Sequence, residues 1–325
     1  MRQFLVTLLL IWAAASIAAF VYSQEQHISR TILFALLPAF LLEIGFYLMP
    51  GFETARKLFD ALGPKAFRAS LLVASAIAPY LLESWRLGSF RFDSLLILIA
   101  LVAIAAFWYA LLKPSPLVDL LFLVLMAGVF LSKVFVQIYP RPTPHLDLEI
   151  LGRLMWIRLG VMAVLSLRRL ENIRFGFLPK FDEWRIGLEQ FLYFLPVGGL
   201  AAFLLHFARF QPITPVWWKM MLFVHAIFFG ILWVVALAEE FFFRGLLQQL
   251  LSRGLHSEVA GLLLTAVVFG AVHLPFRKFP NWRFAVIAGI TGIFYGIAFL
   301  KSRSVRASMV THALVVTTWR SLFTA

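Results

Sequence analysis

The stretch FFGILWVVALAEEFFFRGLL, residues 228–247, places three charged side chains inside an otherwise apolar run. Apolar runs of about 20 residues are long enough to cross a bilayer as a helix. An ionised side chain at the centre of such a helix costs about 2.5–3.5 kcal/mol on insertion scales, so it marks a functional site or a paired charge. The stretch therefore predicts a membrane-embedded helix that carries a polar site.

The whole chain has the composition of a membrane protein. Of its 325 residues, 62% are hydrophobic and 14% are charged, whereas soluble domains have about 25% charged residues. The sequence predicts an all-α, polytopic transmembrane helical bundle with about 8 to 11 spans. A transmembrane barrel would require short alternating strands, and the sequence shows none. The expected spans are 4–22, 31–50, 67–83, 94–112, 117–138, 151–167, 188–206, 217–243, 258–274, 284–300 and 305–322.

A charged connector divides the chain. The segment 168–187 mixes basic, acidic and aromatic residues, which is typical of an amphipathic segment at the membrane interface. We expect an N-terminal membrane module at 1–167, to which the sequence assigns no role. The C-terminal membrane core is expected at 188–325.

The net charge of +13 indicates membrane contacts and not nucleic-acid binding, because the Lys and Arg residues lie between apolar spans. We expect an integral, multi-pass protein that contacts the lipid bilayer and binds no nucleic acid. The distribution of basic residues among the connectors favours a cytoplasmic N-terminus. The chain has no cysteine, which excludes disulfides and thiolate chemistry.

The acids of the opening stretch separate by helical geometry. Glu240 and Arg244 are one turn apart on the same helix face, so we expect a structural ion pair that offsets the cost of burying both charges. Glu239 lies about 140° around the helix from Arg244, which leaves its carboxylate available. The alternative is that the three charges merely end the helix at the membrane interface.

Two histidines lie on later apolar segments. His273 is near the end of the next expected span and His312 is inside the last one. One Glu and two His side chains can hold a water molecule and polarise a carbonyl group, or they can bind a metal. His225 lies about 21 Å along the helix from Glu239, so we expect it to be structural.

A second set of charges lies in the N-terminal half. Glu43 is inside an apolar run, and we expect it to pair across helices with Lys133, Arg153 or Arg158 as a structural interaction. A transporter could use Glu43, Lys133 and the buried acids as a relay. However, the sequence lacks the paired broken helices or repeat symmetry that are typical of transporters.

The C-terminal motifs resemble the CPBP family of intramembrane proteases, which includes the CAAX prenyl protease 2 type and the Abi-like proteins. The resemblance covers roughly residues 217–320. It implies a site within the bilayer that hydrolyses a peptide bond of a membrane protein or lipidated peptide with water. The motifs, in order, are Glu239-Glu240-x-x-x-Arg244, Phe269-x-x-x-His273 and a later helix that carries His312.

The resemblance also implies roles for individual residues. Glu239 and His273 would activate the water, and His312 would stabilise the oxyanion. The family usually has Asn four residues after the later histidine, where this chain has Val316, which cannot donate a hydrogen bond. One alternative is therefore a catalytically inactive, Abi-like membrane binding or scaffold protein.

A zinc-dependent protease is a further alternative, with Glu239, His273 and His312 as metal ligands. The chain has no HExxH helix, and a glutamate-type mechanism accounts for the adjacent pair of acids. We therefore favour a reaction that uses no cofactor.

Overall fold

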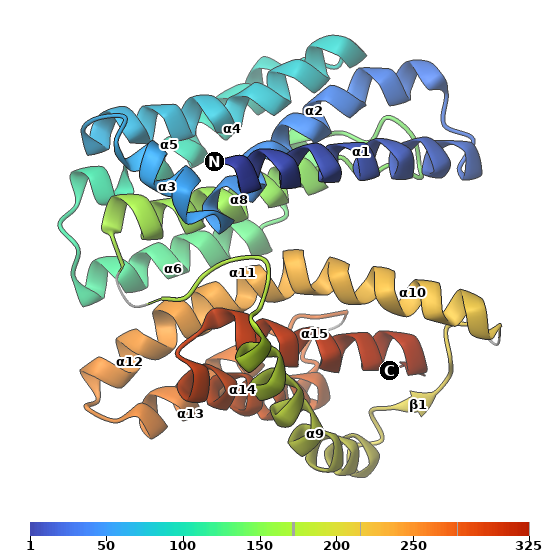
Figure 1. Cartoon of the computed structure of the whole chain (residues 1–325), viewed down its shortest axis with the longest axis vertical. Coiled ribbons are helices and arrows are strands. Elements are labelled where there is room, and N and C mark those ends of the chain that lie inside the picture. Colours follow the sequence, from blue (N-terminus) through green and yellow to red (C-terminus); the bar gives the residue numbers. More distant parts are fainter. Residues whose placement is uncertain (171–172, 215, 278, 325) are drawn as a thin grey trace. The chain divides into compact units, whose positions relative to one another are not determined.

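The structure is a computed structural model that describes residues 1–170, 173–214, 216–277 and 279–324. The chain forms two compact units, Met1–Glu171 and Asn172–Ala325. Both units are built from helices (Figure 1). The predicted all-α fold is therefore confirmed.

The N-terminal unit is a bundle whose helices begin and end at residues suited to those positions. The hydroxyl groups of Ser29 and Ser115 accept hydrogen bonds from the first turns of α2 and α6. Gly88 ends α4 in the left-handed conformation, at φ 66°. The elements are α1 (Arg2–Glu25), α2 (Arg30–Leu48), η1 (Met49–Gly51), α3 (Glu53–Asp60), α4 (Lys65–Leu87), α5 (Phe92–Leu111), α6 (Pro116–Leu131), α7 (Val134–Ile138), α8 (Glu149–Met162) and η2 (Ala163–Arg168).

A buried ion pair links α2 to α8 in this unit. The guanidinium group of Arg158 donates two hydrogen bonds to the carboxylate of Glu43, at 2.6 and 3.1 Å. It also donates to the hydroxyl and carbonyl oxygens of Ser75 on α4, at 3.0 and 2.8 Å. Arg158 is thus the base that pairs with Glu43, whereas Lys133 is exposed and Arg153 pairs with Glu149.

The C-terminal unit is organised around one long helical segment. Residues Trp217–Gly254 form a continuous helical stretch of 38 residues. Two π-helical stretches in this segment, η3 and η4, flank the short helix that carries both acids. The elements are α9 (Phe181–Leu204), β1 (Arg209–Phe210), α10 (Trp217–Gly230), η3 (Ile231–Ala236), α11 (Leu237–Glu240), η4 (Phe241–Gln248), α12 (Gln249–Gly254), α13 (Glu258–Ala271), α14 (Trp282–Ser302), α15 (Val305–Leu322) and β2 (Phe323–Thr324).

Two features differ from the expected boundaries. Helix α9 begins at Phe181, so the end of the predicted connector 168–187 is helical, and the Glu183 carboxylate caps its first turn by accepting from the Lys180 amide at 2.7 Å. The expected span 117–138 is interrupted, because α6 ends at Leu131 and Lys133 adopts a positive φ of 57°.

Glycines bring α13 and α14 close together. A Cβ atom added at Gly270 would lie 2.5 Å from the Ala285 carbonyl oxygen, and one added at Gly296 would lie 2.9 Å from Leu262. Small residues allow the backbones of membrane helices to approach closely in this way. The carbonyl groups of Gly292 and Gly296 on α14 accept hydrogen bonds from side chains of the long helix.

Among the described residues, eight helical segments are long and apolar enough to cross a membrane. They correspond to eight of the eleven expected spans. At the expected spans 117–138 and 258–274, α6 and α13 are apolar but shorter. At 305–322, α15 is a full-length helix whose interior face is rich in Ser, Thr and His side chains, which lowers its apolar content.

The buried pair gives the first prediction. Arg158→Met should lower the free energy of unfolding by about 3–5 kcal/mol, because it leaves the Glu43 charge buried without a partner. Arg153→Met is the control, since its partner Glu149 is on the same helix and the pair is partly exposed, and it should cost about 0–1 kcal/mol. Denaturant unfolding of the purified protein measures both. Equal stability of the two variants would contradict the structural role of the pair.

Candidate active site

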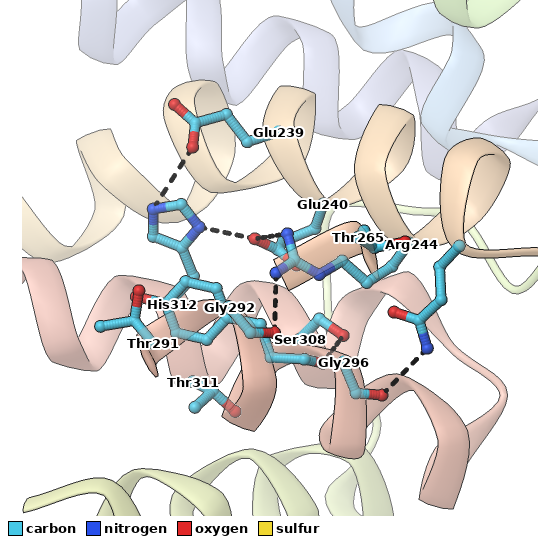
Figure 2. Close-up of polar contacts among 12 residues, drawn as sticks. Glu239, Glu240, Arg244, Thr265, Thr291, Gly292, Gly296, Ser308, Thr311 and His312 are labelled. Carbon is cyan, nitrogen blue, oxygen red and sulfur yellow. Dashed lines mark hydrogen bonds and ion pairs between the residues drawn. The ribbon is translucent and has the colours of Figure 1, made fainter. Parts of the chain in front are cut away.

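Three polar side chains follow one another at one-turn intervals along the long helix: Glu240, Arg244 and Gln248. All three are buried. Arg244 Nε lies 3.2 Å from Glu240 Oε2, and a second guanidinium nitrogen donates to the Gly292 carbonyl at 2.9 Å. Gln248 donates to the Gly296 carbonyl at 3.4 Å (Figure 2). The long helix is thereby joined to two successive turns of α14.

Glu240 also binds a histidine from α15. Its Oε1 atom lies 2.7 Å from Nδ1 of His312, so the Nδ1–H group donates to the carboxylate (Figure 2). The His312 ring stacks on Tyr295 at a centroid distance of 4.6 Å and an interplanar angle of 12°. Phe269 meets the same ring edge-on at 6.1 Å. These contacts fix both the position and the orientation of the imidazole.

Glu239 lies on the other side of His312. Its Oε2 atom is 4.0 Å from Nε2 of His312, too far for a direct hydrogen bond. This oxygen has no hydrogen-bond partner among the described residues, although about a third of the side chain is exposed. Glu239 is therefore the acid of the pair whose carboxylate is available, and it faces the free nitrogen of His312.

His273 and His312 contact the same aromatic ring, that of Phe269. His273 lies in the turn after α13, where its Nδ1 atom is 2.7 Å from the Phe269 carbonyl oxygen. Its ring contacts Phe269 at 4.8 Å and Phe284 at 5.0 Å. Within the described ranges, His273 makes no hydrogen bond or ion pair with Glu239 or His312. The catalytic set of Glu239, His273 and His312 thus stays a prediction.

Among the described residues, these side chains are not grouped as the ligands of a metal ion would be. Zinc ligands lie about 2.0–2.3 Å from the ion, so three donors must converge on one point. In the part of the chain that the structure describes, no three His, Cys, Asp or Glu side chains do so.

Val316 lies one turn beyond His312, about 40° around α15, and adds no hydrogen-bond donor to that face of the helix.

Two contacts of the cluster were not predicted from the sequence. The sequence predicted Arg244 as the partner of Glu240, but the same carboxylate also binds His312. The stacking partner Tyr295 was not singled out either. Both contacts join different helices, and the spacing rules that relate residues on one helix do not apply between helices.

The fold and the site define a helical membrane protein with a buried cluster of acid, arginine and histidine side chains. Residues 217–318, which include the whole cluster, match the family described as type II CAAX prenyl endopeptidase Rce1-like. The resemblance found in the three motifs is confirmed over this segment, and it supports an endopeptidase class. No curated protein and no solved structure matches the chain.

The cluster predicts different effects on stability for its two acids. Glu240→Gln should lower the free energy of unfolding by about 3–5 kcal/mol, because Arg244 keeps a buried charge without an ionised partner. Glu239→Gln is the matched control and should change stability by about 0.5 kcal/mol or less, since the side chain is partly exposed and makes no hydrogen bond through Oε2. Denaturant unfolding compares the two. Equal losses of stability in the two variants would contradict the assignment of Glu240 as the structural acid and Glu239 as the available one.

Proposed function

We propose that this chain is an intramembrane endopeptidase that hydrolyses a peptide bond of a membrane protein or lipidated peptide. The observation that carries the proposal is the free carboxylate of Glu239 facing Nε2 of His312, at 4.0 Å. The other nitrogen of that ring is engaged by Glu240. The family match over residues 217–318 supports the reaction class.

Glu239 is the general base in this proposal. Its carboxylate takes a proton from a water molecule, and the water oxygen attacks the carbonyl carbon of the substrate. The proton then passes to the leaving amine as the C–N bond breaks. Because Glu240 is already paired with Arg244 and His312, Glu239 is the acid of the pair that is free to carry the proton.

His312 stabilises the oxyanion. Its Nδ1–H group is used by Glu240, so a hydrogen bond from Nε2 to the oxyanion requires a ring protonated on both nitrogens. The Glu240 carboxylate compensates the charge of such a ring. A donor that is already oriented before the reaction requires no reorganisation when the negative charge develops.

His273 has a secondary role in the proposal. Its Nδ1–H group donates to the Phe269 carbonyl, which leaves Nε2 as an acceptor for a proton of the attacking water. In the proposal, His273 and Glu239 share that water. In this proposal the reaction uses no metal ion.

We also propose that the N-terminus of the chain is cytoplasmic.

A catalytically inactive membrane-binding protein is the second candidate. Val316 favours it, because the family usually has an Asn donor at this position and valine cannot replace that donor. The two candidates differ in whether any peptide bond is cleaved, so an activity assay separates them.

The first test concerns the base. Glu239→Gln should lower the cleavage rate by about 10²–10⁴, the range attributed to general acid–base catalysis. The assay uses protein in liposomes and a panel of prenylated and unmodified membrane peptides. Glu189→Gln is the matched control, because Glu189 forms a surface pair with Lys301. Cleavage by Glu239→Gln at the rate of the unaltered protein would contradict the assignment.

The second test separates the alternatives. Removal of metal with a chelator should leave the cleavage rate unchanged, whereas one zinc ion per chain and reversible loss of activity would establish the metal-dependent form. Val316→Asn should raise the rate by up to about 10²–10³, because it adds a donor one turn from His312. If neither the unaltered protein nor Val316→Asn cleaves any peptide of the panel, the binding-protein candidate replaces the protease.

A further inference from the structure

The N-terminal unit contains two fully buried glutamates whose surroundings differ. Glu43 and Glu83 are both 0% exposed. The carboxylate of Glu43 accepts hydrogen bonds from the guanidinium group of Arg158, at 2.6 and 3.1 Å. Both carboxyl oxygens of Glu83 lack a hydrogen-bond partner among the described residues. The proposed peptidase reaction does not account for Glu83, because its residues all lie in the C-terminal unit.

Within the described ranges, no base forms an ion pair with Glu83. Arg86 is one turn away on α4, but its side chain donates to the Phe34 carbonyl oxygen at 3.1 Å. Arg91, in the connection to α5, is exposed and pairs with Asp93. The other charged residues of α4 and of the elements that pack most closely against it are paired with each other, exposed, or at the far end of α4: Glu43 with Arg158, Glu149 with Arg153, Asp119 with Arg168, Asp60 with Arg68, and Arg30 and Lys65.

Two tyrosines and a second acid lie near Glu83. Tyr80 is one turn before Glu83 on α4, so the two side chains share a helix face. The Tyr80 ring meets the ring of Tyr139 edge-on at 5.7 Å. The Tyr139 hydroxyl group has no hydrogen-bond partner in the described part of the chain, and it is within electrostatic reach of the Glu83 and Glu43 carboxyl groups. A phenol offers one hydrogen bond and no positive charge, so these neighbours do not neutralise an ionised Glu83.

The position of Glu83 in its helix also disfavours a negative charge. Glu83 is close to the C-terminal end of α4, which ends at Leu87. The helix dipole places partial negative charge at that end, so it favours cations and disfavours carboxylates there. Burial of an ionised carboxylate without a partner is costly, whereas the protonated group is neutral.

The lack of space around Glu83 limits what its carboxyl group can bind. Both oxygens expose essentially no surface. A metal ion requires several ligands around it, and an organic ligand requires a cavity, so neither has room at these atoms. A proton requires no cavity, because it becomes part of the carboxyl group itself.

We propose that Glu83 is a proton-binding site within the N-terminal unit. Its carboxyl group carries a proton at neutral pH, whereas the carboxyl group of Glu43 is ionised and paired with Arg158. An ionisable residue inside a membrane protein is by default a candidate for function. The unit to which the sequence assigns no role thus has a specific ligand, the proton.

The test uses infrared spectroscopy of the full-length protein in liposomes at neutral pH. Glu83→Gln should remove a carbonyl band of a protonated carboxylic acid from the spectrum of the unaltered protein. Glu53→Gln is the matched control and should leave that band in place, because Glu53 forms an exposed pair with Lys57. A spectrum of Glu83→Gln in which no protonated-carboxyl band is lost would overturn the proposal.

A second measurement compares the stability of the two buried acids. Glutamine has nearly the shape of a neutral glutamic acid, so Glu83→Gln should keep the denaturant midpoint of the unaltered protein. Glu43→Gln should lower the midpoint, because it leaves the Arg158 charge without an ionised partner. Equal lowering in both variants would overturn the proposal.

A third measurement distinguishes a proton from a metal cation. Replacement of choline by Na⁺ or K⁺ at constant ionic strength should leave the denaturant midpoint of the unaltered protein unchanged. Stabilisation by either metal ion that is absent in Glu83→Gln would identify a metal cation as the ligand and overturn the proposal. None of these measurements depends on peptide cleavage, so the proton site and the proposed peptidase function can fail independently.

Discussion

The candidate site depends on one carboxylate, that of Glu240, which binds both the Arg244 guanidinium and the His312 imidazole. Glu240 is fully buried, and it accepts hydrogen bonds from Arg244 on its own helix and from His312 on α15. Arg244 in turn reaches the carbonyl of Gly292, where a side chain would have little room: a Cβ atom would lie 3.2 Å from Ala266 and 3.4 Å from the guanidinium group. Three helical segments are therefore held in register by a single buried charge network, and the placement of Glu239 follows from that register.

The spacing of residues along one helix predicted part of this network. Apolar length predicted the helices, and the interval of four residues placed Arg244 beside Glu240. The same reasoning left Glu239 on a different face, where the structure has an available carboxylate. Residue spacing could not predict the contact between His312 and Glu240, because the relative rotation and depth of two helices depend on how they pack. The close approach at Gly270 and Gly296 is one such packing detail.

Backbone irregularities account for other differences between expectation and structure. The π-helical stretches η3 and η4 change the phase of the long helix on both sides of its acids, and no residue pattern in the sequence marked them. π-Helical turns occur frequently at functional sites. The break at Lys133 shortened an expected span, and the turn after α13 directs His273 towards Phe269. Periodicity describes regular helices, so it carries no information on these positions.

The buried pair of Glu43 and Arg158 has a consequence for how the protein is made. The two residues are 115 positions apart in the sequence, although their side chains are in direct contact. At about 5–20 residues per second, a ribosome takes about 6 to 23 seconds to reach Arg158 after Glu43 has been synthesised. During this interval α2 carries an acidic group whose final partner does not yet exist. The ion pair that links α2 to α8 can therefore form only after α8 has been synthesised.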